Sequence, residues 1–119
     1  MSKRKELGKK GELIARRYLQ SLGYKREAEN VRTRMGEIDL IAWDGGELVF
    51  VEVKTSKSNL FSRPEELYSF RQRQRLRKIA EQYLCSAPKK SYSAVRFDFI
   101  GVTFAQSDHK VVHLKNVEL

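Results

Sequence analysis

The stretch "GEIDLIAWDGGELVFVEVK", residues 36–54, places the tightest constraint on what this chain can fold into. Two runs rich in β-branched and aromatic residues, Gly36–Trp43 and Glu47–Lys54, flank the turn sequence Asp-Gly-Gly, which is typical of a β-hairpin. Both runs are apolar enough to be buried, yet they contain four charged residues: Glu37, Asp39, Glu52 and Lys54. The hairpin therefore predicts charged side chains inside a sheet, and these need a physical reason.

Because alternate residues of a strand share a face, the loop length decides which charges meet. A four-residue loop places Asp39 opposite Glu52. The same register places Glu37 opposite Lys54. A two-residue loop at Gly45 instead pairs Glu37 with Glu52 and leaves Asp39 on the diagonal. A three-residue loop without a bulge separates Asp39 from Glu52 onto opposite faces.

The chemistry of two adjacent carboxylates favours a divalent cation. They repel each other, and burying either charge costs on the order of several kcal/mol unless a cation or a proton neutralises it. Oxygen ligands without nearby cysteine or histidine favour Mg²⁺ or Mn²⁺, which keeps waters and accepts a substrate phosphate. Lys54 lies on the face of Glu52, where it would orient or deprotonate a water, or stabilise charge on a phosphodiester. The simpler interpretation is a salt bridge, such as Glu37 with Lys54, on an exposed face.

The segment before the hairpin predicts a helix and a strand. Apolar residues recur at three- and four-residue steps over Glu6–Leu22, which indicates an amphipathic helix that Gly23 ends. Glu12 lies beside its apolar stripe. Residues Tyr24–Val31 alternate enough to predict a strand.

The segment after the hairpin predicts a second helix and two further strands. Ser62 and Glu65 have the spacing of a capping box, and Pro88 marks the exit of the helix. The core-facing stripe is Leu76, Ile79, Ala80, Tyr83 and Leu84, with Cys85 expected to fill the core near the helix end. Strands are predicted over 93–104 and 110–117. The order αβββαββ predicts an α/β fold in which a mixed sheet is flanked by helices.

Composition bounds the size and the partners of the fold. A chain of 119 residues with 40% hydrophobic content suits one domain, spanning 1–119, with one modest core. The net charge of +9 favours nucleic acid as a partner, although a solvated basic surface, ribosomal binding or lipid headgroups also fit. No apolar run suggests a membrane span or a secretory signal, so we expect a cytoplasmic protein with no membrane partner.

A dense basic run, "FRQRQRLRKIA", opens the well-patterned part of the second helix. Helical geometry places three of its cations on one face, where they would follow a phosphate backbone: Arg71, Arg75 and Lys78. Arg32 and Arg34, just before the hairpin, are further candidates for phosphate contacts, or belong to a solvated loop. Gln72 continues the apolar stripe and is a candidate auxiliary residue near the metal, or a hydrogen-bonding spacer.

Four blocks of the chain together resemble a known family. These are "GKKGELIARRYLQSLGY", "RMGEIDLIAWDGGELVFVEVKT", "RLRKIAEQYL" and "VRFDFIGV". They resemble the YraN-like family, an uncharacterised bacterial group described as predicted endonucleases related to archaeal Holliday junction resolvases. More broadly, an acid on the first helix followed by Asp39, Glu52 and Lys54 on a hairpin resembles the PD-(D/E)xK nuclease superfamily, with its restriction-endonuclease-like fold.

The resemblance implies a role for each matched position. Asp39 and Glu52 would be acidic metal ligands, Lys54 the catalytic lysine and Glu12 an auxiliary catalytic acid directed at the same pocket. Glu37 would be a possible auxiliary. The superfamily proline before the aspartate is replaced here by Ile38, which removes no ligand. The implied function is hydrolysis of phosphodiester bonds in nucleic acid. DNA is the expected substrate rather than RNA, with branched DNA as one candidate form and a homodimer as the candidate assembly. The alternative is a non-catalytic nucleic-acid-binding module that acts through a protein partner.

Overall fold

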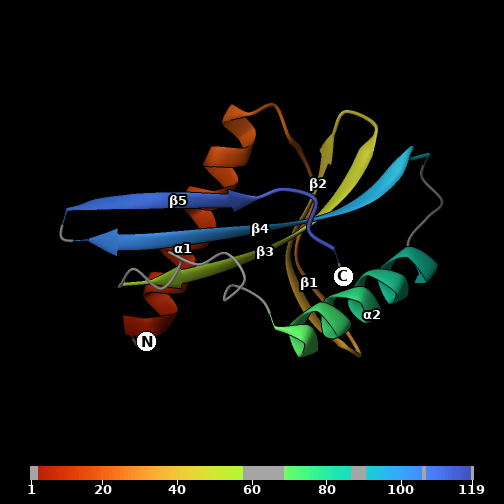
Figure 1. The fold of residues 1–119 in the computed structure, drawn as a ribbon, viewed down its shortest axis with the longest axis horizontal. Coiled ribbons are helices and arrows are strands. Elements are labelled where there is room, and N and C mark those ends of the chain that lie inside the picture. The colour runs from red at the N-terminus through yellow and green to blue at the C-terminus, as the bar shows by residue number, and fades with distance from the viewer. Residues whose placement is uncertain (1–2, 58–68, 87–90, 106, 119) are drawn as a thin grey trace.

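The structure is a computed structural model that describes residues 3–57, 69–86, 91–105 and 107–118. Within these ranges two helices flank a five-stranded sheet (Figure 1). In chain order the elements are α1 (Lys3–Ser21), β1 (Lys25–Thr33), β2 (Gly36–Asp44), β3 (Glu47–Ser56), α2 (Phe70–Ser86), β4 (Ala94–Ala105) and β5 (Asp108–Leu114). The predicted order αβββαββ is confirmed.

The sheet is mixed, as predicted, and its strands follow one another in sequence order from β1 to β5. Strands β3 and β4 are parallel, whereas the other three neighbouring pairs are antiparallel. A parallel pair needs a crossover connection, and the segment that contains α2 provides it. Strand β3 therefore pairs with a hairpin partner on one side and with a distant part of the chain on the other.

The β2–β3 turn settles the register of the hairpin. Trp43 lies opposite Leu48, and Asp44 also pairs with Glu47, so that only Gly45 and Gly46 form the turn. Gly45 has φ +61°, in the left-handed region that a tight hairpin turn requires and glycine adopts without strain. This is the register predicted for the four-residue loop, in which Asp39 lies opposite Glu52. The strands differ from that prediction only in pairing one residue further toward the turn, at Asp44 and Glu47.

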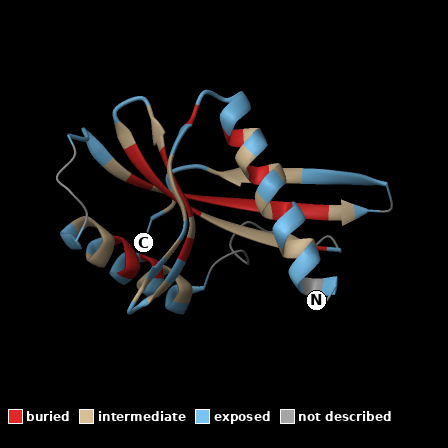
Figure 2. Ribbon diagram, turned by 180° about the vertical axis from the view of Figure 1, so that it is seen from behind, coloured by how far each residue is buried: buried red, intermediate tan, exposed pale blue. Residues whose placement is uncertain are grey.

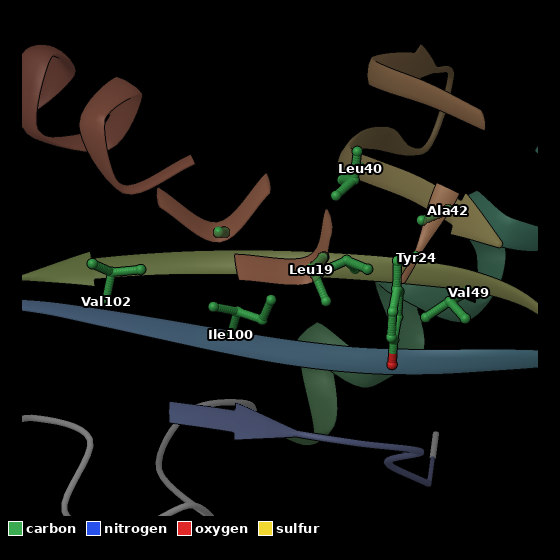
Figure 3. Close-up of a cluster of buried hydrophobic side chains, with 9 residues drawn as sticks. Leu19, Tyr24, Leu40, Ala42, Val49, Ile100 and Val102 are labelled. Carbon is green, nitrogen blue, oxygen red and sulfur yellow. The ribbon is translucent and has the colours of Figure 1, made fainter. Parts of the chain in front are cut away.

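One face of the sheet packs against α1. Ala15 and Leu19 of the helix contact a buried cluster contributed by Tyr24 and by β2, β3 and β4, and Figure 3 labels most of its members. Seen from the α1 side, the helix crosses in front of the strands (Figure 2). Helix α1 approaches β3 closely at Gly11, which has no Cβ. A Cβ added there would lie 3.1 Å from Cβ of Thr55 and would overlap its Cγ2. Gly11 thus sets the distance between helix and sheet.

The opposite face packs against α2, whose buried residues Leu76, Ile79 and Ala80 contact Leu48 and Phe50 of β3. The core-facing stripe predicted for this helix is confirmed at these three positions. No helix in the described part of the chain has the length and apolarity to cross a membrane.

A capping box opens α2 as the structure describes it. The backbone N–H of Gln72 donates to Oγ of Ser69 at 3.2 Å, and that of Ser69 donates to Oε1 of Gln72 at 3.1 Å. The start predicted at Ser62 and Glu65 and the exit at Pro88 lie outside the described residues.

The prediction that Cys85 fills the core is wrong, because its thiol is free and exposed. Cys85 follows Ala80 by five positions, a spacing that turns a helical side chain away from the buried stripe. The prediction rested on the apolar character of cysteine. The angular position of Cys85 on the helix instead places it away from the core face.

Candidate metal centre and nucleic-acid interface

Two neighbouring strands bring Asp39 and Glu52 together. The pairing of β2 with β3 runs from the turn as far as Leu40 opposite Val51, and the next pair in this register is Asp39 with Glu52. Beyond Leu40, the Asp39 side chain bridges the two strands, because its Oδ2 accepts a hydrogen bond from the Val53 N–H at 2.8 Å. The two carboxylates are thus held where the hairpin ladder ends.

Helix α1 adds a third carboxyl group. Glu12 follows Gly11, the residue that allows α1 to lie against Thr55 of β3, and the Glu12 carboxyl lies within hydrogen-bonding distance of Asp39. The close approach at Gly11 therefore carries the next side chain to the acidic pair. This is the arrangement that the resemblance implied for Glu12.

Glu52 is the most perturbed acid of the site. Burial and the nearby charge of Asp39 raise the pKa of Glu52 to about 8, although Arg75 and Lys54 partly offset this increase. A carboxyl group with such a pKa holds its proton at neutral pH when no cation is near. The site therefore disfavours a second negative charge beside Asp39.

Asp39 is perturbed in the same direction. Burial and the charge of Glu12 raise the pKa of Asp39 to about 6, against the Val53 hydrogen bond, which lowers it. Glu37 adds a further negative charge nearby and raises the pKa again. Asp39 and Glu52 consequently titrate as a pair rather than as independent residues.

One oxygen of the site has no hydrogen-bond partner. Oε2 of Glu52 is buried and accepts no hydrogen bond from the described residues. A buried carboxylate oxygen without a donor is costly, and a hard cation would satisfy it. The residues present therefore fit a divalent metal.

The protein side chains alone form an incomplete metal shell. Within residues 3–57, 69–86, 91–105 and 107–118, no group of three or more His, Cys, Asp or Glu side chains is close enough to hold a metal ion. Mg²⁺ is commonly held by one or two carboxylates together with waters and substrate phosphates. Asp39 and Glu52 match that pattern of ligation.

Glu37 makes a different ion pair from the one considered for it. Its carboxylate lies 3.5 Å from Nε of Arg32, the residue opposite it on β1. Lys54 lies close enough to Glu52 to lower the pKa of that carboxyl group. The cross-strand salt bridge between Glu37 and Lys54 is thus replaced by one between Glu37 and Arg32.

The predicted phosphate contacts are all exposed: Arg32, Arg34, Arg71, Arg75 and Lys78. Arg75 also lies near enough to Glu52 to lower the pKa of its carboxyl group, so α2 brings positive charge to the edge of the acidic site. Gln72 uses its side-chain oxygen in the capping box with Ser69, and an additional role beside the acids remains a prediction.

A second polar cluster, which the sequence analysis missed, lies buried on the α1 face around Asp98 of β4. Its carboxylate accepts hydrogen bonds from Tyr24 at 3.0 Å and from Nε of Arg96 at 3.1 Å, and it contacts Nε2 of His113 at 2.8 Å. The backbone N–H of Asn116 donates a further bond at 3.0 Å. Burial opposes ionisation of Asp98, but the hydrogen bonds from His113 and Arg96 prevail and lower its pKa to about 2.

Arg96 extends this cluster to the hairpin turn. Its guanidinium also donates to Oδ2 of Asp44 at 2.9 Å and to the hydroxyl of Tyr24. Every strong hydrogen-bonding group at the centre of the cluster is used, which indicates a structural role. The signal in the sequence was "VRFDF", in which Arg96 and Asp98 alternate with residues that face α2.

Two helices on opposite faces of a mixed five-stranded sheet, with carboxylates where the central hairpin opens, define an α/β protein with a candidate metal centre. The chain belongs to the uncharacterised protein family UPF0102, whose family model matches residues 11–102. The predicted membership of the YraN-like family is confirmed, since this is the same group.

Individual relatives support the assignment over most of the chain. A UPF0102 protein of Desulforamulus reducens is 42% identical over 116 residues, covering 95% of each chain. Another, from Thermodesulfovibrio yellowstonii, is 44% identical over 111 residues, covering 93% of this chain and 94% of the relative. A third, from Solibacter usitatus, is 46% identical over 102 residues, covering 84% of this chain and 76% of the relative. These names state the family and no activity.

Proposed function

We propose that the protein is a divalent-metal-dependent endonuclease, a single domain with a restriction-endonuclease-like fold. Asp39 and Glu52 would hold Mg²⁺ or Mn²⁺, and the substrate would be nucleic acid, DNA rather than RNA. The single observation that carries the proposal is the buried, unpartnered Oε2 of Glu52 beside Asp39. Such an oxygen is explained by a ligand that supplies positive charge.

Each residue of the site has a distinct task in this proposal. A bound divalent cation would polarise the phosphodiester and lower the pKa of an attacking water. Lys54, on the face of Glu52, positions that water and stabilises the charge that develops on the phosphate. Glu12 holds Asp39 in place from α1 and accepts a proton. The three exposed cations on one face of α2 bind the phosphates that flank the scissile bond: Arg71, Arg75 and Lys78.

A non-catalytic nucleic-acid-binding module is the second candidate. It is favoured by the exposed cations of α2, which would bind nucleic acid whether or not the acids hold a metal: Arg71, Arg75 and Lys78. In that case the basic surface would bind nucleic acid, and any chemistry on the nucleic acid would be carried out by a protein partner. The net charge of +9 supports both candidates equally.

A cleavage assay separates the two candidates. Labelled duplex, single-stranded and four-way-junction DNAs, with matching RNAs, are incubated with Mg²⁺, Mn²⁺ or EDTA. Wild type is compared with Glu52→Ala and with Glu81→Ala, which removes an exposed carboxylate from α2. We expect cleavage by wild type and Glu81→Ala with metal, and none by Glu52→Ala or in EDTA.

The other outcome identifies the binding module. If wild type and Glu52→Ala both bind the DNAs and neither cuts under any metal, the endonuclease proposal is overturned. If wild type does cut a four-way junction, sedimentation of the protein with and without that junction tests for the homodimer that symmetrical cutting of two strands requires.

A further inference from the structure

A groove of about 780 Å³ lies between the C-terminal half of α1 and the first residues of β1, on the sheet face opposite α2. The floor is apolar and rigid, since it is formed by Leu19, Tyr24, Leu40 and Ala42, all members of the α1-side core (Figure 3). The groove is therefore a fixed feature of the fold.

The rim of the groove is strongly positive. Among the described residues that line it, four are cations, Arg16, Arg17, Lys25 and Arg26, and one is an acid, Glu29. Glu29 pairs with Arg16 at 3.3 Å and with Arg26 at 2.7 Å. It thereby holds a guanidinium of α1 beside one of β1, while most of the positive charge on the rim stays uncompensated.

The groove and the acidic site share helix α1. Leu13, which lines the groove, directly follows Glu12. Arg16 follows Glu12 by one helical turn, so both lie on the same side of α1. A polyanion whose phosphate reached the acids would therefore meet the first cation of the rim at once.

We propose that this groove binds a single-stranded segment of nucleic acid next to the scissile phosphate. Its cations contact the backbone, and its apolar floor receives a base. The volume lies within the range of roughly 300–1,000 Å³ typical of sites that enclose a small ligand, which suits one or two nucleotides of an unpaired strand. A positive rim beside an apolar or aromatic floor is the combination by which proteins hold single strands. The proposal deepens the proposed nuclease function and names the form of its substrate.

Binding in EDTA tests the groove without turnover. Fluorescence anisotropy of a labelled 12-nucleotide DNA is measured against salt for Arg17→Gln/Lys25→Gln, which removes two exposed cations of the rim. The control is Arg77→Gln/Lys110→Gln, which removes two exposed cations from α2 and β5. We expect the Kd of the groove variant to rise about tenfold at 0.1 M salt, and its salt slope to fall by about 1.4, because each lost contact removes about 0.7.

A cross-linking experiment locates the strand independently. In a Cys85→Ser background, Arg17→Cys should form a disulfide with a single strand that carries an activated disulfide, releasing its leaving thiol, whereas Arg77→Cys should not. The inference is overturned if the groove variant and the control bind with the same Kd and slope, or if only duplex binding weakens. Cleavage by wild type together with unchanged binding of the groove variant leaves the nuclease and removes the groove. If the groove variant binds the single strand more weakly but wild type cleaves nothing, the groove proposal stands and the nuclease proposal is overturned.

Discussion

Asp39 bridges to β3 through the backbone N–H of Val53, at 2.8 Å, where the pairing of β2 with β3 ends. A carboxylate here takes the place of a backbone carbonyl as the acceptor for that N–H. The bond orients one oxygen of Asp39, and the same carboxyl group lies within hydrogen-bonding distance of Glu12. This one side-chain hydrogen bond therefore holds β2 against β3 at the end of their pairing and places Asp39 in the candidate metal centre.

Neutralising Glu52 should stabilise the metal-free protein. Its pKa is raised by burial and by Asp39, so ionisation at pH 8 opposes folding, and Glu52→Gln removes that charge while keeping the shape. We expect the melting temperature in EDTA to rise by a few degrees, about 1 kcal/mol. Differential scanning calorimetry measures it, with Glu81→Gln on exposed α2 as the control. An unchanged or lower melting temperature would contradict close carboxylates.

Stability of the metal-free protein should fall as the pH rises between about 4.5 and 8, the ordinary and the raised pKa of Glu52. The folded state binds more protons than the unfolded chain across this window, so the free energy of unfolding decreases with pH. Urea denaturation at pH 5, 6.5 and 8 measures the slope. The double variant Asp39→Asn/Glu52→Gln should flatten it. A wild-type curve that rises with pH over this window would refute the raised pKa values.

Two glycines of one helix should respond in opposite directions to alanine. Gly8 has no atom within 4 Å of an added Cβ, so Gly8→Ala should stabilise α1 by up to ~1 kcal/mol. A methyl group at Gly11 would overlap Thr55, so Gly11→Ala should destabilise by ~1–3 kcal/mol and displace Glu12. Thermal unfolding of both variants, with metal-dependent cleavage as the second readout, tests this. Equal effects would show that α1 does not rest on β3 at Gly11.

The Asp98 cluster should be essential to folding. Asp98→Asn removes the fully buried counter-charge of Arg96 and leaves only the partly exposed Asp44 and Glu47, and should cost ~3 kcal/mol. Asp108→Asn, at the exposed start of β5, is the matched control and should change stability little. Urea denaturation compares the two. A loss below 1 kcal/mol for Asp98→Asn would mean that the cluster contributes little to the folded state.

Much of the fold was accessible from the sequence because its patterns are local. Side-chain alternation identified the hairpin strands, and helical spacing identified the stripe of α2. The register required the structure, since it depends on whether Asp44 pairs with Glu47 across the turn. The cap at Ser69 was missed because an earlier serine offered the same pattern.

The candidate site was accessible only in part. Alternation could place Asp39 and Glu52 together, but it could not show that Oε2 of Glu52 lacks a donor, which depends on every neighbouring side chain. The groove on the α1 side was out of reach for the same reason. It is lined jointly by α1, β1 and β2, so it depends on how these elements pack rather than on any one segment.

The parallel pairing of β3 with β4 has a consequence for synthesis on the ribosome. Glu47 pairs with Ala94 and Ser56 with Thr103, so the hairpin emerges long before the strand that completes the centre of the sheet. Until then β3 is a free edge, open to pairing with other nascent chains. Glu52 and Lys54 place charge on that edge, and charges there discourage aggregation. The residues proposed to cut a phosphodiester would thus first protect the growing chain.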